Sequence, residues 1–161
     1  RRHGRCGMTP TFTAEDVRQQ LLAHIQEIPG IGWKPSRHAF TDRELQGNVL
    51  GDRTFGIRIG ASGPKDSQRR GAERVQTDYT VRLRHKLAMK DGQDAAQKYA
   101  MDVRTVENWV RAPGVKMDGS IQMEWTGTPE AREVDGAFID TDVIFRAVYW
   151  GRVTGGPDVG G

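Results

Sequence analysis

Cysteine is almost missing from this chain of 161 residues, in which Cys6 stands alone. An internal disulfide is therefore excluded, and a reducing compartment is the expected setting. Long apolar runs are missing too: hydrophobic residues make up 36% of the chain, and no stretch approaches the roughly 18 residues that span a bilayer. No apolar segment follows the basic start RRHGRCG, so we expect neither a signal peptide nor a membrane partner.

Motifs for phosphate binding and nucleophilic catalysis are missing as well. The glycines form no G-x-G-x-x-G or GK[ST] loop, and no serine stands in a nucleophile elbow. His3 and Cys6 are three residues apart, but no second pair of ligand types follows, and a structural zinc site takes four. His24 is interpreted as a boundary residue of a helix, and His38 has no paired nucleophile. We therefore expect no enzymatic activity, no metal and no cofactor.

Two aspartates keep one catalytic alternative open. Asp140 and Asp142 project from the same side of the last expected strand, and carboxylates so placed hold Mg²⁺ in nucleases. A third acidic ligand would have to come from Glu124. We retain a metal-dependent nuclease as a third hypothesis; the simpler interpretation is charge that protects a strand edge or pairs with basic residues.

What the chain does have is an uneven distribution of charge. Residues 1–90 contain 17 Lys and Arg against 9 Asp and Glu, whereas residues 91–161 contain 7 against 12. The net charge of +3 thus divides into +8 and −5. This polarity favours steering of nucleic acid to one face, or contact between the basic side of one subunit and the acidic side of another. Solvated loops that differ in charge are the simpler alternative.

Periodicity predicts two amphipathic helices and about five strands. A helix follows Thr13, whose spacing to Asp16 is that of a capping box, and a second helix follows Asp94 and ends at Pro113. The order α-β-β-β-α-β-β indicates an α+β fold, a two-layer sandwich with both helices on one face of a mixed, mainly antiparallel sheet. We expect strands at 37–45 (weakly), 54–60, 75–87, 121–125 and 138–150, and mobile or turn segments at 60–73 and 126–136.

The domain boundaries follow from composition. We expect a single domain over residues 8–152, because a chain of this length supports one ordinary core. Residues 1–7 are interpreted as a tag or leader-like segment, and residues 153–161 as an extended, glycine-rich tail.

The segment from Val75 to Leu87 alternates most strictly. One side carries apolar residues and His85, which we interpret as a hydrogen-bonded core histidine. The other side is expected to face water as a basic ribbon formed by Arg82, Arg84 and Lys86. These cations either meet a nucleic acid or form one half of a charged contact with acidic residues such as Asp140 and Asp142, on an adjacent strand or on the next subunit.

Sequence-independent binding of nucleic acid is the alternative function. The cations available for phosphate contact are Arg82, Arg84, Lys86, Lys65, Arg69 and Arg70. Single-strand binders interleave aromatic residues with such cations for base stacking, but Tyr79 lies on the opposite side of the ribbon. Base readout is therefore not expected.

Tryptophans favour protein contacts instead. Trp33 lies in a turn-rich connector, Trp109 beside the apolar stripe of the second helix, and Trp150 on the secondary face of the last strand. We expect at least one of them to be exposed at an interface, because tryptophan and arginine are enriched at interface hot spots.

The order of these elements resembles the tail terminator proteins of long-tailed bacteriophages. The features that carry the resemblance, over about residues 12–152, are the helix TAEDVRQQLLAHIQEI, the charged segment 60–73, the strand VQTDYTVRLRHKL, the helix DAAQKYAMDVRTVENWV and the strand FIDTDVIFRAVYW. Other neck and tail proteins of similar fold match the same features.

The resemblance implies a structural role in the virion. Such subunits form a ring, here a homohexamer, that caps the tail tube and joins it to a head-completion or connector protein. DNA passes through the lumen without sequence readout, and the resemblance makes Lys65, Arg69 and Arg70 candidates to face the lumen or the tube. It implies assembly in the host cytoplasm and a final location in the tail or neck. The charge polarity suits the head-to-tail contacts of a ring.

Overall fold

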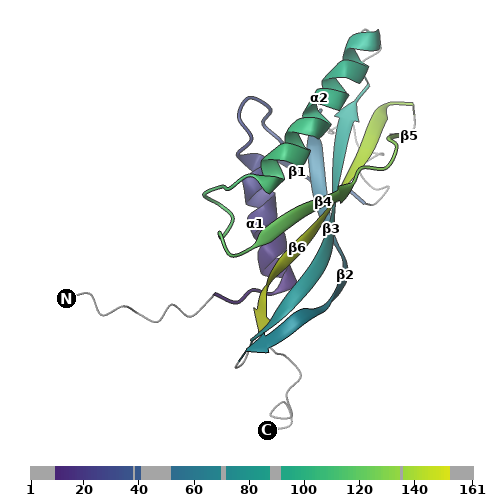
Figure 1. Cartoon of the computed structure of the whole chain (residues 1–161). Coiled ribbons are helices and arrows are strands. Elements are labelled where there is room, and N and C mark those ends of the chain that lie inside the picture. The colour runs from purple at the N-terminus through teal and green to yellow at the C-terminus, as the bar shows by residue number, and fades with distance from the viewer. Residues whose placement is uncertain are drawn as a thin grey trace, which may run out of the picture.

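Two helices cover one face of a six-stranded sheet, as a computed structural model of the chain shows (Figure 1). It describes residues 10–37, 39–40, 52–69, 72–87, 92–134 and 136–152, without the side chains of residues 66–69 and 92–96. The elements are α1 (Ala14–Gln26), β1 (Lys34–Pro35), β2 (Thr54–Arg69), β3 (Ala72–Lys86), α2 (Gly92–Arg111), β4 (Gln122–Gly127), β5 (Arg132–Val134) and β6 (Phe138–Arg152). The predicted α+β sandwich is confirmed, with six strands where about five were expected. Neither the two-residue β1 nor the three-residue β5 was predicted, because both are too short to show a period. Residues 37, 39 and 40, the described part of the strand expected at 37–45, form a turn, so that expectation is wrong there.

The sheet has the strand order β1-β2-β3-β6-β4, and β5 also pairs with β6. β1 runs parallel to β2, whereas all other pairs are antiparallel. The centre is the long ladder between β3 and β6, which extends in unbroken register from Ala72 opposite Arg152 to Lys86 opposite Phe138. This register decides which charged residues of the two strands meet.

The first helix begins and packs as predicted. Thr13 and Asp16 form a reciprocal capping box: Oγ1 of Thr13 accepts from the N–H of Asp16 at 3.1 Å, and Oδ2 of Asp16 accepts from the N–H of Thr13 at 2.9 Å. Val17, Leu21 and Ile25 are fully buried at helical spacing. The helix ends at Gln26, with Glu27 as its C-cap.

The second helix starts at Gly92, two residues before the expected cap, and ends at Arg111 before Pro113. Its buried stripe holds Tyr99, Val106 and Val110, which join the core between the helices and the sheet. No helix in the described part of the chain is long and apolar enough to cross a membrane.

The mobile loop predicted at residues 60–73 is wrong over most of its length. β2 continues to Arg69 and β3 begins at Ala72, so residues 60–69 are hydrogen-bonded strand. Register shifts between Ile59 and Ser62, and again between Pro64 and Gln68, accommodate glycine and proline. Pairing with β3 satisfies this backbone although the segment has no apolar anchor, which is why its composition was misleading.

Several expectations lie outside the described residues. They are the leader-like segment 1–7 with His3 and Cys6, the glycine-rich tail 153–161, His38, Arg70 and most of the weak strand expected at 37–45. The expected turn at 126–136 contains the short strand β5 instead, which pairs with the start of β6.

Candidate functional site

Two arginines of β3 meet two aspartates of β6 across the central ladder. Arg84 donates from Nε and Nη2 to the carboxylate of Asp140 at 2.7 and 2.8 Å. Arg82 donates in the same way to Asp142 at 2.8 and 3.0 Å. Each pair is directly opposite in register, so both arginines form bidentate ion pairs within one chain.

The expected wet basic ribbon is therefore wrong for these two residues. Arg84 is 4% exposed and Asp140 3% exposed. The Arg84 guanidinium lies 5.6 Å from the centre of the Phe138 ring, and that of Arg82 lies 4.5 Å from the centre of the Phe40 ring. The hydrogen bonds that Arg82 donates to Asp142 raise the pKa of Arg82 above its ordinary value. The acidic partners lie on the adjacent strand, so these four residues are engaged inside the fold, and only Lys86 stays an exposed cation of the ribbon.

The pairing with arginine also weakens the hypothesis that Asp140 and Asp142 bind magnesium. Both carboxylate oxygens of Asp140 and of Asp142 accept from a guanidinium. Glu124 lies opposite Arg146 on the neighbouring strand pair. Within the described ranges no group of three His, Cys, Asp or Glu side chains is placed to share a metal ion. The aspartates therefore act as counter-ions to arginine.

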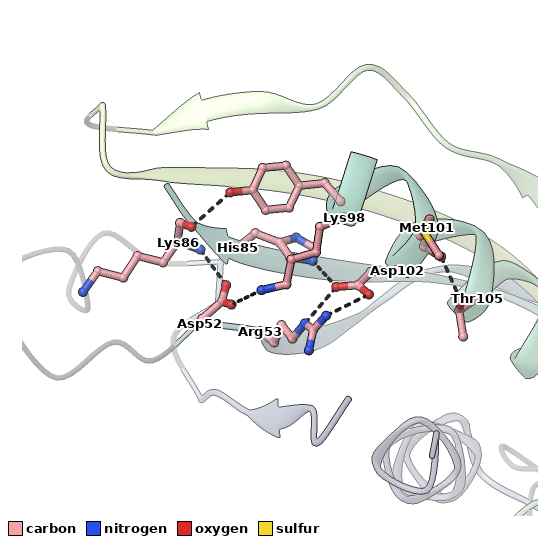
Figure 2. A network of polar contacts seen from close by, with 9 residues as sticks. Asp52, Arg53, His85, Lys86, Lys98, Met101, Asp102 and Thr105 are labelled. Carbon is pink, nitrogen blue, oxygen red and sulfur yellow. Dashed lines mark hydrogen bonds and ion pairs between the residues drawn. The ribbon is translucent and has the colours of Figure 1, made fainter. Parts of the chain in front are cut away.

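A second polar cluster ties the end of β3 to α2 (Figure 2). His85 contacts Oδ2 of Asp102 through Nε2 at 2.8 Å, and Arg53 donates from Nε and Nη2 to the same carboxylate at 2.9 and 3.2 Å. Because a carboxylate can only accept, Nε2 of His85 carries the proton. His85 is fully buried, as its interpretation as a hydrogen-bonded core histidine required.

Burial lowers the pKa of His85 below its ordinary value, although the hydrogen bond and charge of Asp102 act in the opposite direction. The ring lies against Trp33 and Tyr99, with centroids 5.4 and 4.5 Å away. A histidine beside an aspartate is a common acid–base unit, but this ring is 0% exposed. The neutral imidazole therefore holds α2 to the sheet.

Asp52 closes the cluster on its outer side. It accepts from the backbone N–H of Lys86 at 2.9 Å and from Nζ of Lys98 at 3.1 Å. Burial opposes its ionisation, but these hydrogen bonds lower the pKa of Asp52 overall. Tyr99 donates to the carbonyl of Lys86 at 3.0 Å. One sequence signal pointed to this cluster: Asp102 is an acidic residue within the apolar stripe of α2. It was not among the predicted site residues.

The tryptophans are placed differently from the expectation. Trp33 is 3% exposed and belongs to the core. Trp109 is half-buried and exchanges two hydrogen bonds with His24: Nε1 of Trp109 donates to the carbonyl of His24, and Nε2 of His24 contacts the carbonyl of Trp109, both at 2.8 Å. His24 is thus buried between the helices, and its interpretation as a boundary residue is wrong. Trp150 is half-buried beside Arg74.

An open groove of about 750 Å³ lies between α2 and the segment that joins β4 to β5. Its lining is mainly apolar and includes Tyr99, Met101, Val103, Arg104, Pro129 and Ile139. Met101 is 70% exposed. Thr128 fixes one wall, since its hydroxyl donates to Glu107 at 2.7 Å and accepts from Trp125 at 3.0 Å.

The two outer edges of the sheet carry opposite charge. Exposed cations lie along β1 and β2 and just after β1: Lys34, Arg37, Arg58 and Lys65. Exposed carboxylates outnumber exposed cations on β4, on β5 and on the segment between them, where Glu124, Glu130 and Glu133 occur with the single exposed cation Arg132 among the described residues. Among the described residues, none of these carboxylates is bound by a cation of its own chain. Of the cations expected at the lumen, Lys65 is exposed; Arg69 is on β2 but its side chain is not described.

Comparison with known proteins adds no further constraint: no protein-family model matches the chain, and no curated protein sequence matches it.

Proposed function

We propose that this chain is a structural subunit of a bacteriophage virion, a tail terminator that assembles into a hexameric ring. The ring caps the tail tube and joins it to the head-completion or connector protein. The observation that carries the proposal is the opposite charge of the two edges of one sheet. A subunit with two different, complementary edges associates head to tail, and head-to-tail contacts generate rings when the rotation closes.

The basic edge supports this role because its cations are not neutralised locally. Lys34 and Lys65 have exposed side chains with no acidic partner among the described residues. Arg58 lies over the Phe40 ring at 4.8 Å. It forms no ion pair with a carboxylate of another described residue. Complementary charge across an interface promotes encounter and fixes the orientation of the partners.

The long hairpin of β2 and β3 supports contact with the tube or the lumen. Its tip extends beyond the N-terminal end of α1 (Figure 1). Lys65 lies on this projecting part of β2, where the side chain is exposed. A cationic hairpin at the rim of a ring suits DNA that passes without sequence readout, because phosphate contacts carry no sequence information.

The alternative, a nucleic-acid-binding module, has less support. Arg82 and Arg84 donate their hydrogen bonds to Asp142 and Asp140, so two of the six cations proposed to contact phosphate are already paired with carboxylates. Of the rest, Lys65 and Lys86 are exposed on different parts of the sheet. Single-strand binding stacks bases on exposed aromatic rings. The described rings on this face, Phe40, Phe138 and Trp150, are buried or half-buried, and each lies against an arginine.

Electron microscopy tests the proposal. The full chain is purified alone and after co-expression with the products of neighbouring reading frames. We expect rings of the isolated protein, or rings seated on one end of short tubes. A protein that stays monomeric with every partner and binds duplex DNA with a steep salt dependence would overturn the proposal and favour the alternative.

A further inference from the structure

We propose that neighbouring copies in the ring join their sheets edge to edge, with residues 122–125 of β4 in one copy antiparallel to residues 57–60 of β2 in the next copy and Glu124 directly opposite Arg58. The occupant of each edge is thus a second copy of this chain. This inference rests on the proposed ring and identifies the contact that would build it.

Both edges are open where the pairing requires it. β1 pairs with β2 only at Thr54 and Phe55, and the last bond on that side runs from the N–H of Ser36 to the carbonyl of Phe55 at 2.7 Å. From Ile57 onward, the outer side of β2 has no strand partner among the described residues. The outer side of β4 is equally open within the described sheet. Open edges present unpaired N–H and carbonyl groups that favour pairing with another chain.

The strand directions fit a repeated side-by-side arrangement. β2 is antiparallel to β3, β3 to β6, and β6 to β4, so β2 and β4 run in opposite directions. Copies that keep one orientation therefore bring β4 against β2 as an antiparallel pair. α1 lies over β2 and α2 over β4, so the helical layer continues across the same contact.

The faces of the strands select the register. Ile57 and Ile59 lie on the helix-covered face, because they are opposite Val81 and Tyr79 of the core. Met123 and Trp125 lie on that same face of the sheet, opposite Ala147 and Phe145. Since side chains alternate with period two, an even register keeps these residues together.

Placing Arg58 opposite Glu124 also places Ile57 opposite Trp125 and Ile59 opposite Met123. The pairing covers Trp125, which is 37% exposed, and Met123, which is half-buried on the edge strand. A shift by two residues moves Arg58 to Gln122 or Thr126 and separates the charges. Opposite charges directly across an antiparallel pair stabilise it, and β4 offers no proline or lysine that would block its edge.

The available charges match this contact. Arg58 has an exposed side chain and contacts the Phe40 ring, and Glu124 is exposed with no hydrogen bond or ion pair to another described residue. The segments also match in extent, because residues 57–60 lie beyond the pairing of Phe55 with β1, and residues 122–125 are the first four of the six residues of β4.

Cysteine cross-linking tests the register in a Cys6→Ser background. Directly opposed residues of an antiparallel pair have Cα atoms roughly 4.5–5.5 Å apart, within the roughly 4.4–6.8 Å that a disulfide spans. We expect the variant with Ile59→Cys and Met123→Cys to give a ladder of oxidised oligomers up to ring size. The single-cysteine variants, and the shifted pair Ile59→Cys with Trp125→Cys, are expected to give no ladder.

Charge reversal tests the same contact by light scattering. Arg58→Glu or Glu124→Arg alone should raise the concentration needed for assembly at least about tenfold, because like charges then face each other. The double reversal should restore assembly, and Arg104→Glu on α2 is the matched control that should change nothing. Rings of the parent chain without the 59–123 cross-link and without rescue would overturn this pairing and leave the ring standing. A chain that is monomeric under all conditions would overturn both.

Discussion

Arg84 on β3 and Asp140 on β6 lie directly opposite each other and form a bidentate ion pair that is almost wholly buried. The desolvation penalty of two buried charges cancels much of the attraction between them, but removing either partner leaves the other buried without a counter-ion. We therefore expect the pair to fix the register of the central ladder more than it adds stability. The alternation of β3 predicted a solvent-exposed basic face, but at Arg84 the charge of that face is paired with Asp140.

Removing one partner of this pair should destabilise the protein strongly. We expect Arg84→Ala to lower the free energy of unfolding by about 3–5 kcal/mol, because it leaves the Asp140 carboxylate buried and unpaired. Urea denaturation measures the change. Arg146→Ala is the matched control: its pair with Asp78 is about one-third exposed, so the expected loss is about 1 kcal/mol or less. Equal losses in both variants would contradict the burial of the first pair.

Acid should destabilise the fold through His85. Its pKa is lowered by burial, so the unfolded chain binds the proton more readily than the folded one. The stabilisation is complete above the unfolded pKa of about 6.5 and is lost as the pH falls from there through the lower folded pKa. The groups that face the ring are Asp102, Asp52 and Arg53.

Urea denaturation at pH 7.5 and pH 5.5 measures this dependence, and His85→Gln should flatten it. An NMR titration of the His85 ring provides an independent readout that needs no variant. The midpoint of the ring should lie below the ordinary histidine value; a midpoint at or above that value would show that burial does not dominate its pKa.

The contact between Gly114 and the His24 ring should tolerate no added methyl group. A Cβ atom at position 114 would lie 2.3–2.4 Å from two atoms of the ring. We expect Gly114→Ala to cost about 1–3 kcal/mol in the free energy of unfolding. In a His24→Ala background the ring is gone, so the same change should cost almost nothing. A double-mutant cycle with no coupling between the two positions would contradict this packing.

Binding of DNA, where it occurs, should depend on lysine rather than on the paired arginines. Lys65→Ala and Lys86→Ala should each reduce the slope of log K against log salt by about one for a short duplex. The neutral pair Arg82→Gln with Asp142→Asn should leave the slope unchanged, because the native pair already carries no net charge. A smaller slope in that double variant would show that Arg82 contacts phosphate.

The parts of the fold that depend on local pattern could be predicted from the sequence. Thr13 and Asp16 signalled the start of α1, and alternation found β3 and β6. The extension of β2 could not be predicted, because residues 60–69 contain glycine and proline and no apolar residue beyond Ala61. Only their hydrogen bonds to β3 make them a strand.

The charged contacts depend on information that periodicity does not contain. The pairing of Arg84 with Asp140 follows from the register between two strands that are separated by α2 and β4. The burial of Trp33 follows from where its connector crosses the core. Asp102 was a detectable exception, since an acidic residue within an apolar helical stripe predicts a buried partner. The opposite charge of the two sheet edges required the strand order, which places β2 and β4 on opposite sides.

Native mass spectrometry of the unmodified chain over a range of concentrations tests whether it assembles head to tail into a closed ring. We expect one dominant oligomer, a hexamer of the 18.0 kDa subunit, whose population rises with concentration and whose size does not. An open-ended series of sizes, or the monomer alone at every concentration with and without a tube partner, would contradict it.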